Sequence, residues 1–211
     1  MKLRQLVLAA SVVAAAASSA WVSTAAFAAD AKEQFFPVLP YRTGAYAPNG
    51  VPWANGYSDY LRLINSRDGG INGVKITYEE CDTAYATDRG VECYERLKGK
   101  NGGATVFQPL STGITFALTE KAPGDKIPLI TAGYGRSESA DGGVFKWNFP
   151  LAGTYWVAGD VIIQDIAKKA GGADKLKGKH IALVYHDSPF GKEAIPILQE
   201  RAAMHGFKLS L

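Results

Sequence analysis

The segment over residues 53–82 constrains the fold most, because a helical pattern passes there through a glycine-rich turn directly into a strand pattern. The apolar residues of its first part have the spacing of one face of an α-helix. They are Trp53, Tyr57, Tyr60, Leu61 and Ile64. Residues 65–73 supply the glycines and turn formers that end a helix, and residues 74–78 alternate as in a strand. A helix and a strand joined this closely predict the αβ half of a βαβ layer.

The first 28 residues have the pattern of a secretory signal peptide. Lys2 and Arg4 precede an uncharged run rich in Ala and Val over residues 6–20, and residues 26–28 (Ala-Phe-Ala) place small residues where a signal peptidase reads them. The alternative is a retained membrane anchor, which the short apolar run disfavours. No cysteine follows the run, which excludes lipidation there. We therefore expect export of the chain with residues 1–28 removed.

The remainder, residues 29–211, is long enough for one substantial domain and too short for two complete large ones. Removal of Lys2 and Arg4 from the 23 basic residues leaves 21, against 20 acidic residues. A nearly neutral chain without a basic run argues against nucleic acid or an anionic membrane as partner.

Two cysteines, Cys81 and Cys93, are present in a chain predicted to reach an oxidising compartment. An isolated pair there is more often a disulfide than a metal site, so we expect a Cys81–Cys93 disulfide. Two buried free thiols are the alternative. The three histidines are scattered along the chain, and no metal site is predicted.

Strand and helix patterns alternate along the first 150 residues. Residues 33–39 have the pattern of a first strand, in which Pro37 predicts a bulge or an unpaired backbone position. A loop is expected over residues 41–50. Further strands are predicted at residues 104–107, 126–131 and 144–149, with helices at residues 86–97 and 114–121. The first of these helices is expected to turn inward the face shared by Ala86, Gly90, Cys93 and Leu97. This alternation predicts an α/β fold, a Rossmann-like parallel sheet with helices on both faces.

The pattern restarts beyond Pro150. A helix that ends at residues 171–172 is predicted from the apolar stripe of Val157, Val161, Ile162 and Ile166. Strands are predicted at residues 179–185 and 207–211. Between them, Pro196 must lie in the first turn of a helix or kink it. The domain organisation predicted is a first lobe over residues 29–150 and the beginning of a second, incomplete lobe over residues 151–211.

No common catalytic motif is present. The sequence lacks G-x-S-x-G, H-E-x-x-H and G-x-x-x-x-G-K-[ST], so no enzyme, catalytic residue or cofactor is predicted. Ser111, Asp187 and His186 would supply the residue types of a triad, but adjacent His and Asp side chains usually diverge.

Loops at the carboxyl ends of the predicted strands are the remaining candidates for function. They are rich in hydroxyl groups and aromatic rings, which is typical of a small-molecule binding site. They cover residues 41–46, 108–112, 132–135 and 186–190. The alternative is that these are ordinary turn and cap residues; Ser111 or Thr112 is also well placed as a helix N-cap.

Residues 64–65 (Ile-Asn) and 69–76 (GGINGVKI) resemble the I-N-x-x-G-G-I-x-G-x-K motif of ABC transporter substrate-binding proteins of the branched-chain amino-acid and amide type. Residues 186–187 (His-Asp) and 190–191 (Phe-Gly) are similar to the D-x-x-[YF]-G stretch at the opening of that family's second lobe. The resemblance covers the whole mature chain. It implies the leucine-binding-protein-like type I periplasmic fold, in which two Rossmann-like lobes close over a ligand without catalysis or cofactor.

The resemblance also implies which residues bind. Ser111 matches the serine that holds the polar head of the ligand, with Thr112 beside it. Phe190 falls where an aromatic ring covers the ligand from the other lobe. The second polar loop contains Tyr134, and the first loop contains Tyr41, Arg42 and Tyr46.

The resemblance implies a periplasmic solute-binding protein, monomeric when full length, that delivers its ligand to the permease subunits of an ABC importer. We expect a small carboxylate, either a branched-chain amino acid or an aromatic acid, with its head group at the loop of Ser111 and Thr112. Arg42 would add a charge-assisted hydrogen bond, or else be a solvated surface residue. Urea or short amides, a ligand-sensing ectodomain on the same fold, and an exported enzyme are the alternatives.

Overall fold

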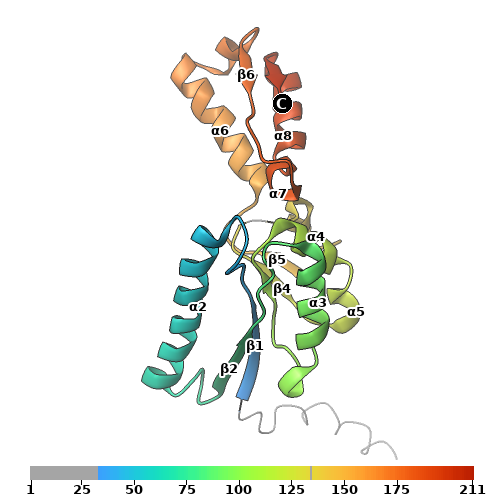
Figure 1. Ribbon diagram of the computed structural model, residues 1–211. Coiled ribbons are helices and arrows are strands. Elements are labelled where there is room, and N and C mark those ends of the chain that lie inside the picture. Colours follow the sequence, from blue (N-terminus) through green and yellow to red (C-terminus); the bar gives the residue numbers. More distant parts are fainter. Residues whose placement is uncertain (1–32, 134) are drawn as a thin grey trace, which may run out of the picture. The chain divides into compact units, whose positions relative to one another are not determined.

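Parallel strands form the centre of the first part of the chain in the computed structural model, which describes residues 33–133 and 135–211 (Figure 1). Strands β1 (Glu33–Leu39), β2 (Lys75–Glu80) and β3 (Gln108–Pro109) make a sheet in the order β2-β1-β3. Strands β4 (Leu129–Thr131) and β5 (Asn148–Pro150) make a second parallel pair. An isolated bridge between Phe107 and Leu129 joins the segment before β3 to β4. The predicted α/β fold with a parallel sheet is confirmed.

Pro37 lies inside β1, and the irregularity expected there is found on the neighbouring segment. Phe35 pairs with Ala104 and Val38 with Gln108. The paired positions are three residues apart on β1 and four residues apart on the neighbouring segment. The register with β2 runs without interruption from Glu33 to Val38. The neighbouring segment therefore has one extra residue opposite the stretch of β1 that contains Pro37, which has no N–H to donate to a ladder.

Helix α2 (Ala47–Asp68) is longer than predicted, because residues 47–50, expected as loop, already belong to it. It ends at Gly69, whose left-handed φ of 70° suits a glycine. Leu61 and Ala54 face the sheet, whereas Tyr60 is 58% exposed. The prediction that Tyr60 shares the buried face is therefore wrong, since the helix packs through a narrower stripe than its spacing suggested.

The other face of the sheet is covered by α3 (Thr87–Leu97) and α4 (Thr112–Thr119), followed by the short α5 (Ala122–Asp125). The predicted inward face of α3 is confirmed for its glycine, its cysteine and its last leucine, which are buried. The fully buried side chains between these helices and the sheet include Leu39, Tyr94, Leu97, Phe107, Ile114, Leu118 and Leu129. This is the largest core of the described chain.

The segment over residues 126–150 contains less strand than predicted. Strand β4 begins at Leu129, and β5 begins at Asn148 rather than at residue 144. Val144 is 68% exposed, because a turn beginning at Asp141 continues to Phe145, which donates its amide to the Asp141 carbonyl at 2.9 Å. A short 3-10 helix, η2 (Ser137–Ala140), precedes that turn.

Residues 151–211 contain α6 (Tyr155–Ala170), η3 (Ala173–Leu176), α7 (Pro189–Lys192) and α8 (Ile195–His205). Strands β6 (His180–Ala182) and β7 (Lys208–Ser210) pair in parallel between them. Pro196 lies in the first turn of α8, as expected. Strand β6 is shorter than the predicted residues 179–185.

Only Ile166 of the predicted apolar stripe of α6 packs against the core, and the other three residues of the stripe are exposed. Ile163 and Ala167 face the core, whereas Val157, Val161 and Ile162 are more than half exposed. Leu176, Leu198 and Phe207 complete that core on one side of α6. The two-stranded sheet and α8 cover only one side of α6. Because α6 has more apolar residues than that side can hold, some of them stay exposed.

Residues 33–211 form one compact unit. The predicted signal peptide and Tyr134 lie outside the described residues. None of the described helices has both the length and the apolar character that crossing a bilayer requires.

Candidate functional site

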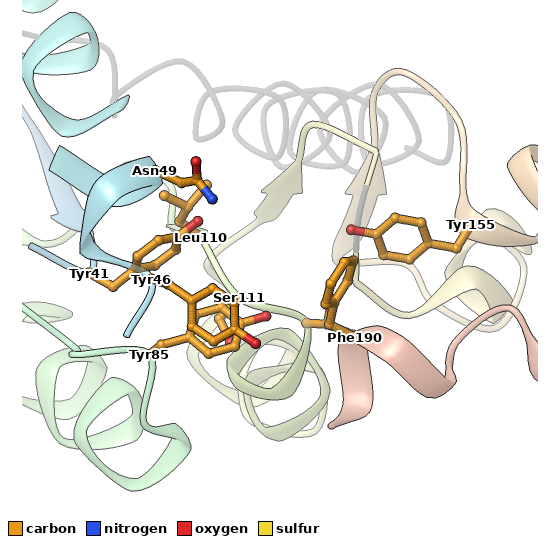
Figure 2. Close-up of a pocket in the computed structure, with 9 residues that line it drawn as sticks. Tyr41, Tyr46, Asn49, Tyr85, Leu110, Ser111, Tyr155 and Phe190 are labelled. Carbon is orange, nitrogen blue, oxygen red and sulfur yellow. The ribbon is translucent and has the colours of Figure 1, made fainter. Parts of the chain in front are cut away.

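A cavity of about 210 Å³ lies where β1, β2 and β3 end (Figure 2). Its residues come from the loops after these strands, the first turns of α2, α4 and α6, and helix α7. They are Tyr41, Tyr46, Asn49, Tyr85, Leu110, Ser111, Thr112, Tyr155 and Phe190. All nine side chains are uncharged and five are aromatic. The carboxyl ends of parallel strands are the usual place for a ligand in α/β folds.

Three tyrosines form one aromatic wall of the cavity. The ring centroids of Tyr46 and Tyr85 are 4.4 Å apart and tilted, and those of Tyr41 and Tyr85 are 5.1 Å apart in an edge-to-face arrangement. Such geometries bring the positive edge of one ring to the negative face of another. Figure 2 shows Tyr155 and Phe190 on the opposite side, with ring centroids 5.5 Å apart.

Tyr41 is placed by a close approach of α2 to the loop after β1. Gly50, buried in the first turns of α2, lies against the Tyr41 backbone, and a Cβ atom at position 50 would be 1.9 Å from the Tyr41 carbonyl oxygen. A larger residue at position 50 would therefore push α2 away from this loop. The glycine thus has a steric role in forming one corner of the cavity.

The polar end of the cavity is the start of α4. The Ser111 hydroxyl caps the helix by accepting from the Ile114 amide at 3.4 Å, as predicted for an N-cap. The first intrahelical backbone bond runs from the Thr115 amide to the Ser111 carbonyl at 2.9 Å. The amides of Thr112 and Gly113 precede that bond and have no acceptor within the helix. These amides and the helix dipole make this end favourable for negative charge.

The pKa values of three phenol groups of the cavity, Tyr41, Tyr85 and Tyr155, are raised, so these groups remain neutral over the physiological range. Burial, followed by the electrostatic effects of Tyr46 and Tyr155, raises the pKa of Tyr85 to about 12. Burial also raises the pKa of Tyr41 and of Tyr155. The tyrosine hydroxyls are consequently donors that can serve an anion without themselves becoming charged.

Five of the seven residues expected to bind ligand are brought together here: Tyr41, Tyr46, Ser111, Thr112 and Phe190. Their role in binding stays a prediction. Tyr134 lies outside the described residues.

Arg42, for which both a ligand contact and a surface position were expected alternatives, is not among the residues that line the cavity. Its Nη2 donates to a Glu80 carboxylate oxygen at 2.8 Å, and its Nη1 donates to the Asn55 side-chain oxygen at 2.8 Å. The ion pair with Glu80 turns the guanidinium toward β2 and α2, away from the lining residues. The cavity is thereby left without a cationic side chain among its described lining residues.

Four lining residues are not among the individually named candidates: Asn49, Tyr85, Leu110 and Tyr155, of which Leu110 lies in the candidate loop over residues 108–112. Tyr85 had a usable signal, because it follows a strand at its carboxyl end just as Tyr41 and Tyr46 do. Asn49 was assigned to the loop, although it lies in the first turn of α2. Tyr155 is the first residue of α6, directly after the N-cap Thr154. Nothing in the local sequence marks it as a lining residue, because its place in the cavity depends on tertiary contacts.

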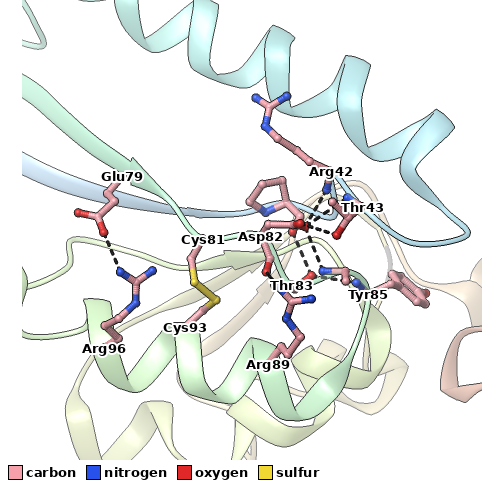
Figure 3. The surroundings of a disulfide bond; sticks show 12 residues. Arg42, Thr43, Glu79, Cys81, Asp82, Thr83, Tyr85, Arg89, Cys93 and Arg96 are labelled. Carbon is pink, nitrogen blue, oxygen red and sulfur yellow. Dashed lines mark hydrogen bonds and ion pairs between the residues drawn. A yellow bond between two sulfur atoms is a disulfide. The ribbon is translucent and has the colours of Figure 1, made fainter.

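The expected disulfide is present next to this site. Cys81, just after β2, is joined to Cys93 in α3, with a distance of 5.8 Å between their Cα atoms (Figure 3). The bond ties the loop that carries Tyr85 to the buried face of α3. No cluster of three or more His, Cys, Asp or Glu side chains suited to a metal occurs in the described part of the chain.

Comparison with protein families gives a match to a model described as periplasmic binding protein, over residues 33–210. Among solved structures, a protein described as an ABC transporter permease from the Pseudomonas fluorescens group is similar, with a TM-score of 0.72 and 47% sequence identity. The similarity covers 84% of this chain and 43% of that one. The comparison with curated proteins gives no match.

Two more distant structures share the fold. A branched-chain amino acid ABC transporter protein from Thermus thermophilus with bound valine has a TM-score of 0.72 at 23% identity, over 84% of this chain and 44% of that one. A fatty acid ABC transporter substrate-binding protein from Thermomonospora curvata has a TM-score of 0.67 at 20% identity, over 84% and 43%. The chain thus spans less than half the length of each of these structures.

Proposed function

Because this chain belongs to the periplasmic binding protein family, whose members bind small solutes outside the cytoplasm and are not enzymes, we propose that it is the solute-binding component of an ABC importer. In this proposal residues 1–28 are a cleaved signal that directs it to the periplasm. Residues 29–150 are the N-terminal lobe, and residues 151–211 open the second lobe. The 47% identity to the protein from the Pseudomonas fluorescens group supports this assignment.

The proposed ligand is a small carboxylate with an apolar or aromatic body, either a branched-chain amino acid or an aromatic acid. The observation that carries this proposal is the pairing of five aromatic rings with the start of α4 in one uncharged cavity. The rings supply flat apolar walls, and the helix start supplies amide donors to a carboxylate. A volume of about 210 Å³ lies below the roughly 300–1,000 Å³ of sites for drug-sized molecules, which favours a metabolite of few heavy atoms.

Two structural neighbours are consistent with a carboxylate. Valine is bound in the protein from Thermus thermophilus, and the protein from Thermomonospora curvata is described as a fatty acid transporter component. Both ligands carry a carboxylate on an apolar body. The shared fold makes the same general arrangement reasonable here.

Urea or a short amide is the second candidate. The exposed Asn49 side chain and the neutral hydroxyls of Ser111 and Thr112 can both donate to and accept from an amide. A small amide has little apolar surface to bury, however, so a cavity with five aromatic rings favours a ligand with an apolar body.

A ligand screen by thermal shift and calorimetry tests the proposal. Branched-chain amino acids, benzoate and its ring-substituted relatives, urea and acetamide form the panel. A ligand at 100 times its dissociation constant stabilises the protein by about 2.7 kcal/mol, which raises the melting temperature measurably. Stabilisation by urea or acetamide together with none by any carboxylate would contradict the carboxylate proposal.

Two matched variants test the location of the site. The double substitution Ser111→Ala and Thr112→Ala removes the hydroxyls at the start of α4 but keeps its amides, and it should reduce the ligand-induced shift. Thr154→Ala is the control, because it removes the hydroxyl that caps α6 through the Val157 amide and does not line the cavity. Each cap loss costs about 1 kcal/mol of stability, so the two proteins differ in binding rather than in folding. Unchanged affinity in the double variant would remove this site assignment.

A further inference from the structure

Asp82 lies between the two loops that carry the three tyrosines of the cavity wall (Figure 3). Its Oδ1 accepts from the backbone amides of Arg42 at 2.9 Å and Thr43 at 3.4 Å, in the loop after β1. The same oxygen accepts from the amide of Ala84 at 3.0 Å, in the loop after β2. Its Oδ2 accepts from the Thr43 hydroxyl at 2.5 Å. One carboxylate thus joins both loops, and it does not line the cavity itself.

The loop after β2 has a backbone conformation that needs such support. Ala84 and Tyr85 have φ values of 48° and 63°, in the left-handed region that side chains other than glycine rarely occupy. Two such residues in succession persist only when their surroundings determine them. The buried Thr83 contributes, since its hydroxyl donates to the Pro40 carbonyl at 3.0 Å and accepts from the Tyr85 amide at 3.2 Å.

The two loops also touch directly, so that neither can shift alone. Gly44 has a left-handed φ of 84°, and a Cβ atom at this position would lie 3.0 Å from the Ala84 carbonyl oxygen. A displacement of the loop after β2 would therefore be transmitted to the loop that carries Tyr41 and Tyr46.

Asp82 is itself anchored on the side away from the cavity. Its carbonyl oxygen accepts from Nη2 of Arg89 in α3 at 3.0 Å, and its neighbour Cys81 is bonded to Cys93 in the same helix. The position of the carboxylate is therefore set by α3, which belongs to the main core.

We propose that Asp82 is a positioning residue of the cavity, which holds Tyr41, Tyr46 and Tyr85 in their mutual arrangement and thereby sets ligand affinity without touching the ligand. The part of this inference that concerns affinity rests on the proposed function; the part that concerns the loops does not. Burial raises the pKa of the Asp82 carboxyl, but the hydrogen bonds from Thr43 and the three amides outweigh it and the pKa is lowered. Asp82 is accordingly an ionised acceptor at neutral pH.

Hydrogen exchange followed by mass spectrometry, without ligand, tests the positioning role. In Asp82→Ala, amides in peptides covering residues 41–46 and 82–86 should exchange about tenfold faster, the factor expected when hydrogen bonds to a charged group are lost. The near-ultraviolet circular dichroism of the tyrosines should weaken in parallel. Asp82→Asn should recover most of the protection, since its Oδ1 still accepts from amides. Asp59→Ala, which removes an exposed carboxylate on α2, is the matched control and should leave both signals unchanged.

Two exchange results would overturn the proposal. One is unaltered exchange in both peptides of Asp82→Ala. The other is faster exchange throughout the chain, including α4 and α6, with no recovery in Asp82→Asn, because that pattern marks a general loss of stability. Should Asp82→Ala not fold, Thr43→Val replaces it, since it removes the hydroxyl that donates to Oδ2 and should raise exchange over residues 41–46 alone.

Calorimetry with benzoate as the probe tests the consequence for affinity. Binding by Asp82→Ala should be weaker than that of the unaltered protein by about tenfold, with partial recovery in Asp82→Asn. Equal binding by Asp82→Ala would overturn the link to affinity. If the unaltered protein does not bind benzoate, the aromatic-acid form of the proposed function fails, and the exchange experiment still decides whether Asp82 positions the loops.

Discussion

Residues 33–150 and residues 151–211 use the same alternation of strand and helix, but they bury it to different extents. In the first region the two faces of β1 are both covered: Val38 packs with Leu61 of α2, and Phe35 packs in the core with α3 and α4. In the second region Ile163 and Leu198 share a core between α6 and α8, while Val161 remains 55% exposed and Val184 95% exposed. The β6–β7 pair and its helices therefore leave apolar surface exposed, whereas a sheet covered by helices on both faces buries it.

The difference teaches that an apolar stripe predicts a buried face only when enough neighbours are present. On α3 the spacing identified the buried residues, because a sheet and a second helix lie against it. On α6 the same argument selected residues that are exposed. Four experiments sharpen or break this contrast.

Truncation of a fully buried residue in the first region should have the largest effect, and truncation of an exposed apolar residue on α6 should have little. Phe107 is fully buried, so Phe107→Ala should lower the free energy of unfolding by about 3–5 kcal/mol. Val161→Ala removes atoms that are already half in water and should change it by less than about 0.5 kcal/mol. Urea denaturation followed by circular dichroism measures both. Comparable losses in the two variants would show that the contrast in burial has no energetic counterpart.

Loss of the disulfide should come next. It closes a short loop within the first region, and in the chain-entropy model its removal by Cys81→Ala with Cys93→Ala costs about 3 kcal/mol. The intact mass of the exported protein should not increase on alkylation without reductant, and should increase by two adducts after reduction. Uptake of reagent by two thiols in the unreduced, denatured protein would rule the bond out.

A smaller effect should appear at Glu193, which joins the two regions. One of its carboxylate oxygens accepts from the Ser137 amide at 2.6 Å, and its carbonyl accepts from the Trp156 indole at 3.0 Å. Burial raises the pKa of the Glu193 carboxyl above its ordinary value. The folded state therefore binds this proton more tightly than the unfolded state, and the stability contributed by the protonated form is lost as the pH rises through the raised pKa.

Glu193→Gln keeps an acceptor for Ser137 and removes the charge. When the pH is raised from the ordinary pKa of glutamate to neutral, the melting temperature of Glu193→Gln should fall less than that of the unaltered protein. Melting curves over pH 4–8 measure this difference, with the exposed Glu92→Gln on α3 as control. A steeper decline in Glu193→Gln than in the unaltered protein would contradict the assigned direction.

The smallest effect on stability, but a clear one on association, is expected from the exposed face of α6. Val157, Val161 and Ile162 present apolar surface that invites contact between copies of residues 29–211. Val161→Lys with Ile162→Lys should reduce the concentration-dependent association seen in sedimentation velocity. The free energy of unfolding should change by less than about 0.5 kcal/mol. A monodisperse monomer at high concentration without these substitutions would contradict the expectation.

Local chemistry accounts for what could be predicted from the sequence. The N-cap at Ser111, the glycine at the end of α2 and the alternation of strand and helix each depend on neighbours within a few positions. The disulfide is nearly as local, since 12 positions separate its cysteines. These features required no knowledge of distant contacts.

The tertiary structure alone decided which side chains meet at the cavity. Arg42 pairs with Glu80, which is 38 positions away, and it is not among the residues that line the cavity. Tyr85 and Tyr155 join the cavity because separate elements bring their rings to one place, and the strained loop that orients Tyr85 depends on Asp82 and Thr83. The physical reason is that hydroxyl, aromatic and charged groups interact with whichever partner the fold brings close to them. The spacing of residues along the sequence carries no information on which distant residues become neighbours.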